Sequence, residues 1–170
     1  DVYKRQSQCL PGKGLSSKAV EESEYKSVYR ERTSKRCVFE KALTNLQAKC
    51  ALSDHFCLAD REGYACKDEV SSLNCSKILE KLRENSQFVL KLREVDGPLP
   101  HNMEIRVQAG GLRGLSRLLN ASSLDGQMAT ENINGVVQSV IDKYGSLDAL
   151  PYNEIVQSIV QFQGRRRRQR

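Results

Sequence analysis

The stretch CALSDHFCLADREGYACKDEVSSLNC, residues 50–75, holds four of the six cysteines in this 170-residue chain. It lies between two stretches in which apolar residues recur at helical spacing. We therefore expect an antiparallel helical hairpin, with one helix over about 24–53 and the other over about 72–92. The turn of this hairpin would gather the cysteines, so we expect any chemistry to lie there.

The first helix is predicted from Phe39, Leu43, Leu46 and Cys50, which are spaced by four, three and four residues. This spacing places them on one face of an α-helix. Cys37 precedes Cys50 by thirteen positions, which on a continuous helix is about 20 Å and a different face. Neither Gly nor Pro lies between them to break the helix. The prediction therefore leaves Cys37 out of the candidate site.

The second helix is predicted from an apolar stripe that runs from Cys75 to Leu92, with Ser71 or Ser72 as its N-cap. Gly97 and Pro98 should end it, because proline cannot continue a helix. This point is the best candidate for a boundary within the chain.

The sequence after this boundary predicts three or so shorter helices packed on the hairpin, so the fold class is all-α. The first of them contains three glycines, and a break at Gly110 and Gly111 is as well supported as one continuous helix. A later helix should end at Gly145, and the last should open after Pro151.

The domain organisation follows from these patterns. Residues 1–20 form an irregular N-terminal segment, 21–96 the cysteine-containing hairpin, 97–164 the C-terminal helical unit and 165–170 a basic tail. Residues 1–6, DVYKRQ, resemble the translation of a sequencing adapter, so we exclude them from the fold.

The net charge of +6 comes from the chain ends, because residues 7–164 carry 20 basic and 20 acidic groups. An arginine-rich tail binds phosphate backbones without sequence specificity. A neutral body lacks the basic face that is typical of a domain that reads nucleic acid.

Four cysteines form the candidate metal site: Cys50, Cys57, Cys66 and Cys75. None of them makes the C-x-x-C pair of most structural zinc sites. This absence weakens the case for zinc more than the case for an iron–sulfur cluster, because a cluster needs convergent thiolates without a fixed spacing. His55 is a candidate substitute ligand.

Two alternatives stay open for the cysteines. They can be free thiols packed as small apolar side chains in a reducing cytosol. They can also form the nested disulfides Cys50–Cys66 and Cys37–Cys75, which over residues 37–75 loosely resemble twin-cysteine helical hairpin proteins. The two intervals differ by four residues, which departs from that pattern, and the resemblance implies an oxidising compartment.

The function predicted is that of a small non-enzymatic, cytoplasmic protein that binds another protein, because the chain lacks the usual catalytic motifs and has two histidines. No apolar run is long enough to span a membrane. The alternative is nucleic-acid association. Gly111-Leu112-Arg113-Gly114 resembles the G-x-x-G loop of KH domains, although the flanking strands are missing. The candidate phosphate contacts are Gly111, Arg113, Gly114, Arg165, Arg166, Arg167 and Arg168.

Overall fold

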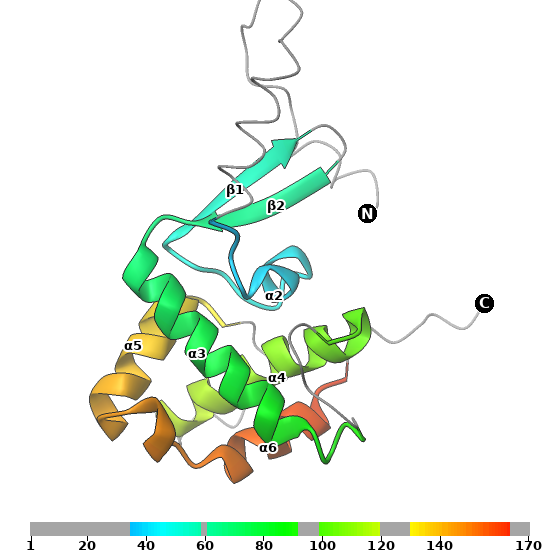
Figure 1. Cartoon of the computed structure of the whole chain (residues 1–170), viewed down its shortest axis with the longest axis vertical. Helices are drawn as coiled ribbons and strands as arrows, with labels where there is room; N and C mark the ends of the chain where they lie inside the picture. Colours follow the sequence, from blue (N-terminus) through cyan, green and yellow to red (C-terminus); the bar gives the residue numbers. More distant parts are fainter. Residues whose placement is uncertain (1–34, 59–60, 92–98, 120–129, 164–170) are drawn as a thin grey trace, which may run out of the picture.

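The computed structural model describes residues 35–58, 61–91, 99–119 and 130–163. The elements follow in the order α2 (Glu40–Thr44), β1 (Ser53–Leu58), β2 (Arg61–Cys66), α3 (Glu69–Ser86), α4 (His101–Leu119), α5 (Ile133–Tyr144), the 3-10 turn η2 (Leu147–Ala149) and α6 (Tyr152–Gln161). The structure is mostly helical, as the predicted all-α class requires, but it also contains a small antiparallel hairpin of two strands that was not predicted (Figure 1).

The helices pack around one apolar core. α4 packs against α6, α5 and α3, and the β1–β2 hairpin lies at one end of this helical body (Figure 1). The largest fully buried apolar side chains come from the residue before α2 and from α3, α4, α5 and α6: Phe39, Ile78, Leu79, Leu82, Val107, Leu112, Leu115, Ile133, Val137, Ile155 and Ile159. Burial of these stripes is the main favourable contribution to the fold.

Several helix boundaries confirm the sequence patterns. α5 ends before Gly145, which has φ of 77°, and α6 begins directly after Pro151. The start of α3 differs from the prediction: its N-cap is Asp68, whose carboxylate accepts a hydrogen bond of 2.8 Å from the Ser71 amide. Ser71 and Ser72 therefore lie inside the first turn of the helix.

The first helix of the predicted hairpin, over about residues 24–53, differs most from the structure. Among the described residues it contains only α2, which ends at Thr44, and Leu46 then adopts a left-handed conformation with φ of 55°. The chain turns there without a glycine or proline. The predicted residues 24–34 of this arm lie outside the described residues.

The stretch that was expected to form the turn between the two helices forms β1 and β2 instead. Ser53 pairs with Cys66 at one end of the ladder and Leu58 with Arg61 at the other. The rings of His55 and Tyr64, which are directly opposite, lie 4.9 Å apart. Such cross-strand ring pairs stabilise two-stranded hairpins.

α4 is one continuous helix through all three of its glycines, and this excludes the predicted G-x-x-G loop. Gly110, Gly111 and Gly114 are buried in the helix interior. A Cβ at Gly110 would lie 2.7 Å from the Ile159 Cα, and one at Gly114 would lie 2.9 Å from the Ile155 Cα. These glycines therefore let the backbones of α4 and α6 approach closely.

We predict that Gly110→Ala lowers the free energy of unfolding by about 1–2 kcal/mol, because overpacking against the α6 backbone outweighs the gain in helix propensity. Urea unfolding followed by circular dichroism measures it. The matched control is Gly135→Ala in α5, where a Cβ would meet only the side chain of Asn132. Equal stability changes in the two variants would contradict the close helix crossing.

Candidate functional site

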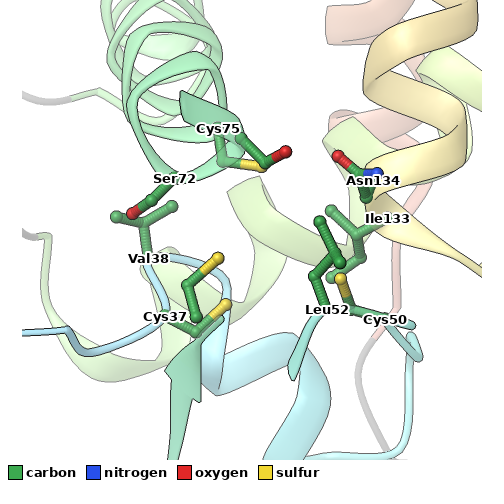
Figure 2. Close-up of a pocket in the computed structure, with 10 residues that line it drawn as sticks. Cys37, Val38, Cys50, Leu52, Ser72, Cys75, Ile133 and Asn134 are labelled. Atoms are coloured by element: carbon green, nitrogen blue, oxygen red, sulfur yellow. The ribbon is translucent and has the colours of Figure 1, made fainter. Parts of the chain in front are cut away.

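The candidate site is a small pocket where the β-hairpin meets the helical body. Four of the ten residues that line it are cysteines, and the full set is Cys37, Val38, Cys50, Leu52, Cys66, Ser71, Ser72, Cys75, Ile133 and Asn134. Figure 2 shows Cys37, Cys50 and Cys75 projecting towards a common space from separate parts of the chain.

Each of the four cysteines comes from a different segment. Cys37 precedes α2, Cys50 lies in the loop between α2 and β1, Cys66 ends β2, and Cys75 lies in the second turn of α3. Of these four residues, Cys75 is buried and the other three are half-buried. The site therefore joins parts of the chain that span 39 residues of sequence.

Backbone hydrogen bonds hold Cys37 beside the hairpin. The Cys37 amide donates to the Tyr64 carbonyl at 2.7 Å, and the Cys66 amide donates to the Lys35 carbonyl at 2.8 Å. Arg36 forms an antiparallel bridge with Ala65 between these two bonds. The segment before α2 thus lies along β2 and carries Cys37 into the pocket.

The Cys50 loop is held by its own polar contacts. The Cys50 carbonyl accepts hydrogen bonds from the Ser53 amide at 3.2 Å and from the Ser53 hydroxyl at 2.8 Å. The Ala51 amide donates to the Asn132 side chain at 3.2 Å. The loop is therefore fixed both to β1 and to the start of α5.

The environment of the thiols is apolar and enclosed. Burial, together with smaller effects of the neighbouring thiols of Cys37, Cys50 and Cys66, raises the pKa of the Cys75 thiol to about 12. Burial also raises the pKa of Cys37 to about 12, against a smaller opposing effect of a backbone hydrogen bond at Phe39. Both thiols are neutral at physiological pH unless a cation stabilises their thiolates.

The pocket contains three of the four cysteines of the predicted quartet. Cys50, Cys66 and Cys75 line the pocket as expected, but Cys37 takes the place given to Cys57. Cys57 lies within β1, paired with Glu62, and is not among the pocket residues. The argument that separated Cys37 from Cys50 required one continuous helix between them, whereas α2 ends at Thr44.

The remaining predicted site residues lie elsewhere. His55 on β1 faces Glu62, with 3.5 Å between its Nε2 atom and the carboxylate. Arg113 stacks over the ring of Phe162 at 4.7 Å and donates to the Gln47 side chain. Gly111 and Gly114 are buried in α4, so they cannot clamp a phosphate backbone. The tail residues Arg165, Arg166, Arg167 and Arg168 lie outside the described residues.

The four pocket sulfurs are free thiols in this structure. Within the described ranges, no group of three or more His, Cys, Asp or Glu side chains is already set at metal-ligating distances. Ligation would therefore need the four sulfurs to move inwards from their present positions.

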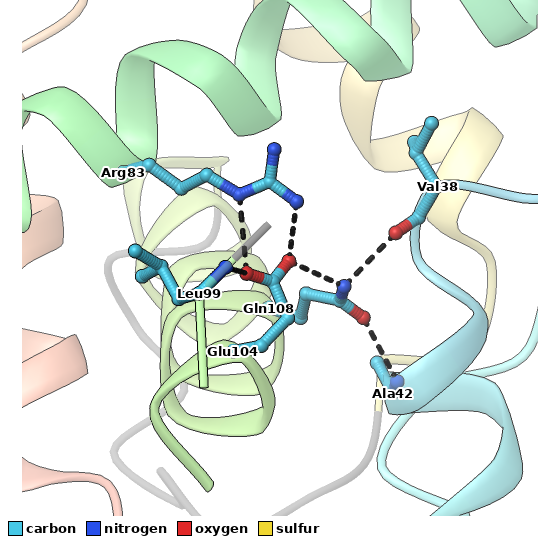
Figure 3. Close-up of polar contacts among 6 residues, drawn as sticks. All are labelled: Val38, Ala42, Arg83, Leu99, Glu104 and Gln108. Atoms are coloured by element: carbon cyan, nitrogen blue, oxygen red, sulfur yellow. Dashed lines mark hydrogen bonds and ion pairs between the residues drawn. The ribbon is translucent and has the colours of Figure 1, made fainter. Parts of the chain in front are cut away.

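A buried ion pair lies near the pocket, between α3 and α4. The Glu104 carboxylate, which is 1% exposed, accepts two hydrogen bonds from Arg83 at 3.1 and 2.6 Å (Figure 3). It also accepts from the Leu99 amide at 3.0 Å and the Gln108 side chain at 2.8 Å. Burial opposes the charged form of Glu104, but these four hydrogen bonds outweigh it and lower the pKa.

Gln108 connects this ion pair to the cysteine segment. Its Nε2 atom donates to the Val38 carbonyl at 2.9 Å, and its Oε1 atom accepts from the Ala42 amide at 3.1 Å. The residues on both sides of Phe39 are thereby fixed to α4. The position of Cys37 depends on this anchor as well as on β2.

Comparison of this chain with protein-family models, with characterised proteins and with solved structures finds no match. Among the described helices, none has the length and apolar character needed to cross a membrane. The functional argument therefore depends on the geometry of the chain itself.

We predict that Glu104→Gln lowers the free energy of unfolding by about 3 kcal/mol at neutral pH, because it leaves the Arg83 charge buried without its partner. The lowered pKa of Glu104 means that its stabilising contribution is present above about pH 4.3 and is lost as the pH falls through the folded-state value. The difference between the parent protein and the variant should therefore shrink in acid.

Denaturant unfolding at pH 7 and at pH 3 measures this difference. The control is Glu80→Gln, which removes an exposed carboxylate from the neighbouring surface of α3 and should change stability by less than about 0.5 kcal/mol. A pH-independent cost for Glu104→Gln would show that its charge does not stabilise the fold.

Proposed function

We propose that Cys37, Cys50, Cys66 and Cys75 bind one thiophilic metal ion, with zinc as the favoured metal, and that this ion clamps the β-hairpin to the helical body. The observation that carries the proposal is the convergence of four thiols from four separate segments on one pocket. Four cysteine thiolates around one ion are a recurrent set of ligands for structural zinc.

The size of the pocket favours a single ion over an iron–sulfur cluster. Its cavity of about 10 Å³ is close to the smallest volume that holds one water molecule. A cluster adds several irons and sulfides between the same four cysteines. The walls of the pocket would have to separate to admit it, whereas a single ion needs the sulfurs to close around it.

The surroundings also suit a structural role. Besides the cysteines, the pocket is lined by three apolar side chains and by Ser71, Ser72 and Asn134, and among the described residues no carboxylate or histidine belongs to this lining. Structural zinc sites are closed by four protein ligands, whereas catalytic sites keep one position open for water or substrate. The proposal is therefore a metal-stabilised, non-enzymatic protein.

Binding of a partner protein is the role that we assign to this metal-stabilised fold. Val70 and Leu73 lie one turn apart at the start of α3, close to the pocket, and are 67% and 57% exposed. Apolar side chains at this spacing on a helix suit contact with another protein. A metal clamp at the start of α3 would hold them in a fixed position.

We predict that the protein purified under reducing conditions contains one zinc ion per chain and that Cys37→Ser removes it, because a serine hydroxyl is a poor replacement for a thiolate ligand. Cys57→Ser changes a cysteine that does not line the pocket, so it should retain the metal. Elemental analysis of folded, gel-filtered protein measures both. Retention of zinc by Cys37→Ser together with its loss from Cys57→Ser would restore the quartet predicted from the sequence.

We also predict that removal of the metal by a chelator lowers the midpoint of thermal unfolding, because an ion bound only to the folded state stabilises that state by mass action. The amides of Cys37 and Cys66, which pair the N-terminal segment with β2, should then exchange with solvent faster than those of α4 and α6. Hydrogen exchange with and without chelator measures this. Uniform exchange rates across the chain after metal removal would contradict a local clamp.

A further inference from the structure

A second hollow lies on the other side of Cys37, between the N-terminal segment, α3 and α4. It is an open groove of about 470 Å³, within the usual range for sites that bind small molecules. Most of the residues that line it have polar or charged side chains, in contrast to the cysteine pocket: Arg36, Cys37, Val38, Glu40, Lys41, Ser76, Leu79, Glu80, Arg83, Glu104 and Gln108.

Most of the polar groups in this groove are already paired. Arg36 and Glu40 form a two-point ion pair, with 2.5 and 2.9 Å between their atoms. Glu104 accepts four hydrogen bonds, and Gln108 uses both its amide nitrogen and its amide oxygen. Glu104 and Gln108 therefore have little hydrogen-bonding capacity left for a ligand.

Arg83 is paired in the same way as Arg36, through its Nε and Nη2 atoms, but it is more buried: its side chain is 14% exposed, against 50% for Arg36. The Nη1 atom has no partner among the described residues, and Figure 3 shows the remaining nitrogen directed away from the carboxylate. A guanidinium fixed in this way presents N–H donors to the groove at little further entropic cost.

Lys41 adds a second donor to the lining, and the part of the chain that the structure describes holds no ion-pair partner for it. The Glu80 carboxylate forms no ion pair with another described residue and is exposed, so water screens its charge. The groups of the groove that are best able to bind a ligand are therefore positively charged hydrogen-bond donors.

We propose that this groove binds a small molecule through a phosphate or carboxylate group, which accepts hydrogen bonds from Arg83 and Lys41. Charge-assisted hydrogen bonds from a guanidinium to an oxyanion are stronger than those between neutral groups. The proposal does not depend on the metal, although Cys37 lines both the groove and the cysteine pocket.

The test is a titration of ¹⁵N-labelled full-length protein, as purified, with inorganic phosphate and separately with succinate at constant ionic strength. We expect saturable amide shifts confined to residues 36–41 and 76–83 with at least one of the two anions. No saturable shift with either anion, or shifts spread evenly over the surface, would overturn the proposal.

Arg83→Lys keeps a positive charge opposite Glu104 but removes the second arm of the guanidinium, so it should weaken binding about tenfold. Arg106→Lys is the matched control, because Arg106 also lies on a helix but donates to carbonyls of α6 away from the groove. If Arg83→Lys does not fold, Lys41→Gln on the groove wall should weaken binding, while Glu80→Gln should leave it unchanged or tighter. Equal binding by the parent, Lys41→Gln and every folded variant would overturn the proposal.

Discussion

The pairing of residues 35–37 with β2 determines where the cysteines lie. Two short backbone hydrogen bonds, Cys37 to Tyr64 and Cys66 to Lys35, place the N-terminal segment beside the hairpin. Because Cys66 also precedes the N-cap of α3 by two residues, the same pairing brings Cys37 close to the start of that helix. The metal proposal, and the boundary between the pocket and the groove, both depend on this arrangement.

The helical body could be predicted from the sequence in most respects. The spacing of apolar residues in α3, α5 and α6 is regular, and Gly145 and Pro151 mark boundaries that the structure confirms. The glycines of α4 were ambiguous, because their low helix propensity is a local property. Their contact with α6 is a tertiary property, and close backbone packing decided in favour of a continuous helix.

The cysteine site could be predicted only in part. Cys50, Cys66 and Cys75 were expected to converge, and they do line one pocket. Cys37 was missed because its apolar neighbours have helical spacing, whereas the helix ends at Thr44 and Leu46 takes a left-handed conformation that the sequence does not mark. The aromatic and β-branched content near His55 and Tyr64 is too sparse to predict a hairpin, although their ring contact helps to form one.

The buried ion pair of Arg83 and Glu104 helps to hold in place the residues of both proposed sites, the cysteine pocket and the groove. Glu104 fixes Arg83 on the groove side, and Gln108 carries the same network to the carbonyl of Val38, next to Cys37 (Figure 3). Such a network stabilises a fold only when its buried groups are satisfied, as those of Glu104 and Gln108 are.

X-ray absorption spectroscopy at the metal edge of the purified protein tests the central claim, that four cysteines bind one metal ion, most directly. The account predicts one zinc ion with a single shell of four sulfurs at about 2.3 Å; a short metal–metal distance, a shell of oxygen and nitrogen, or the lack of a stoichiometric metal would contradict it.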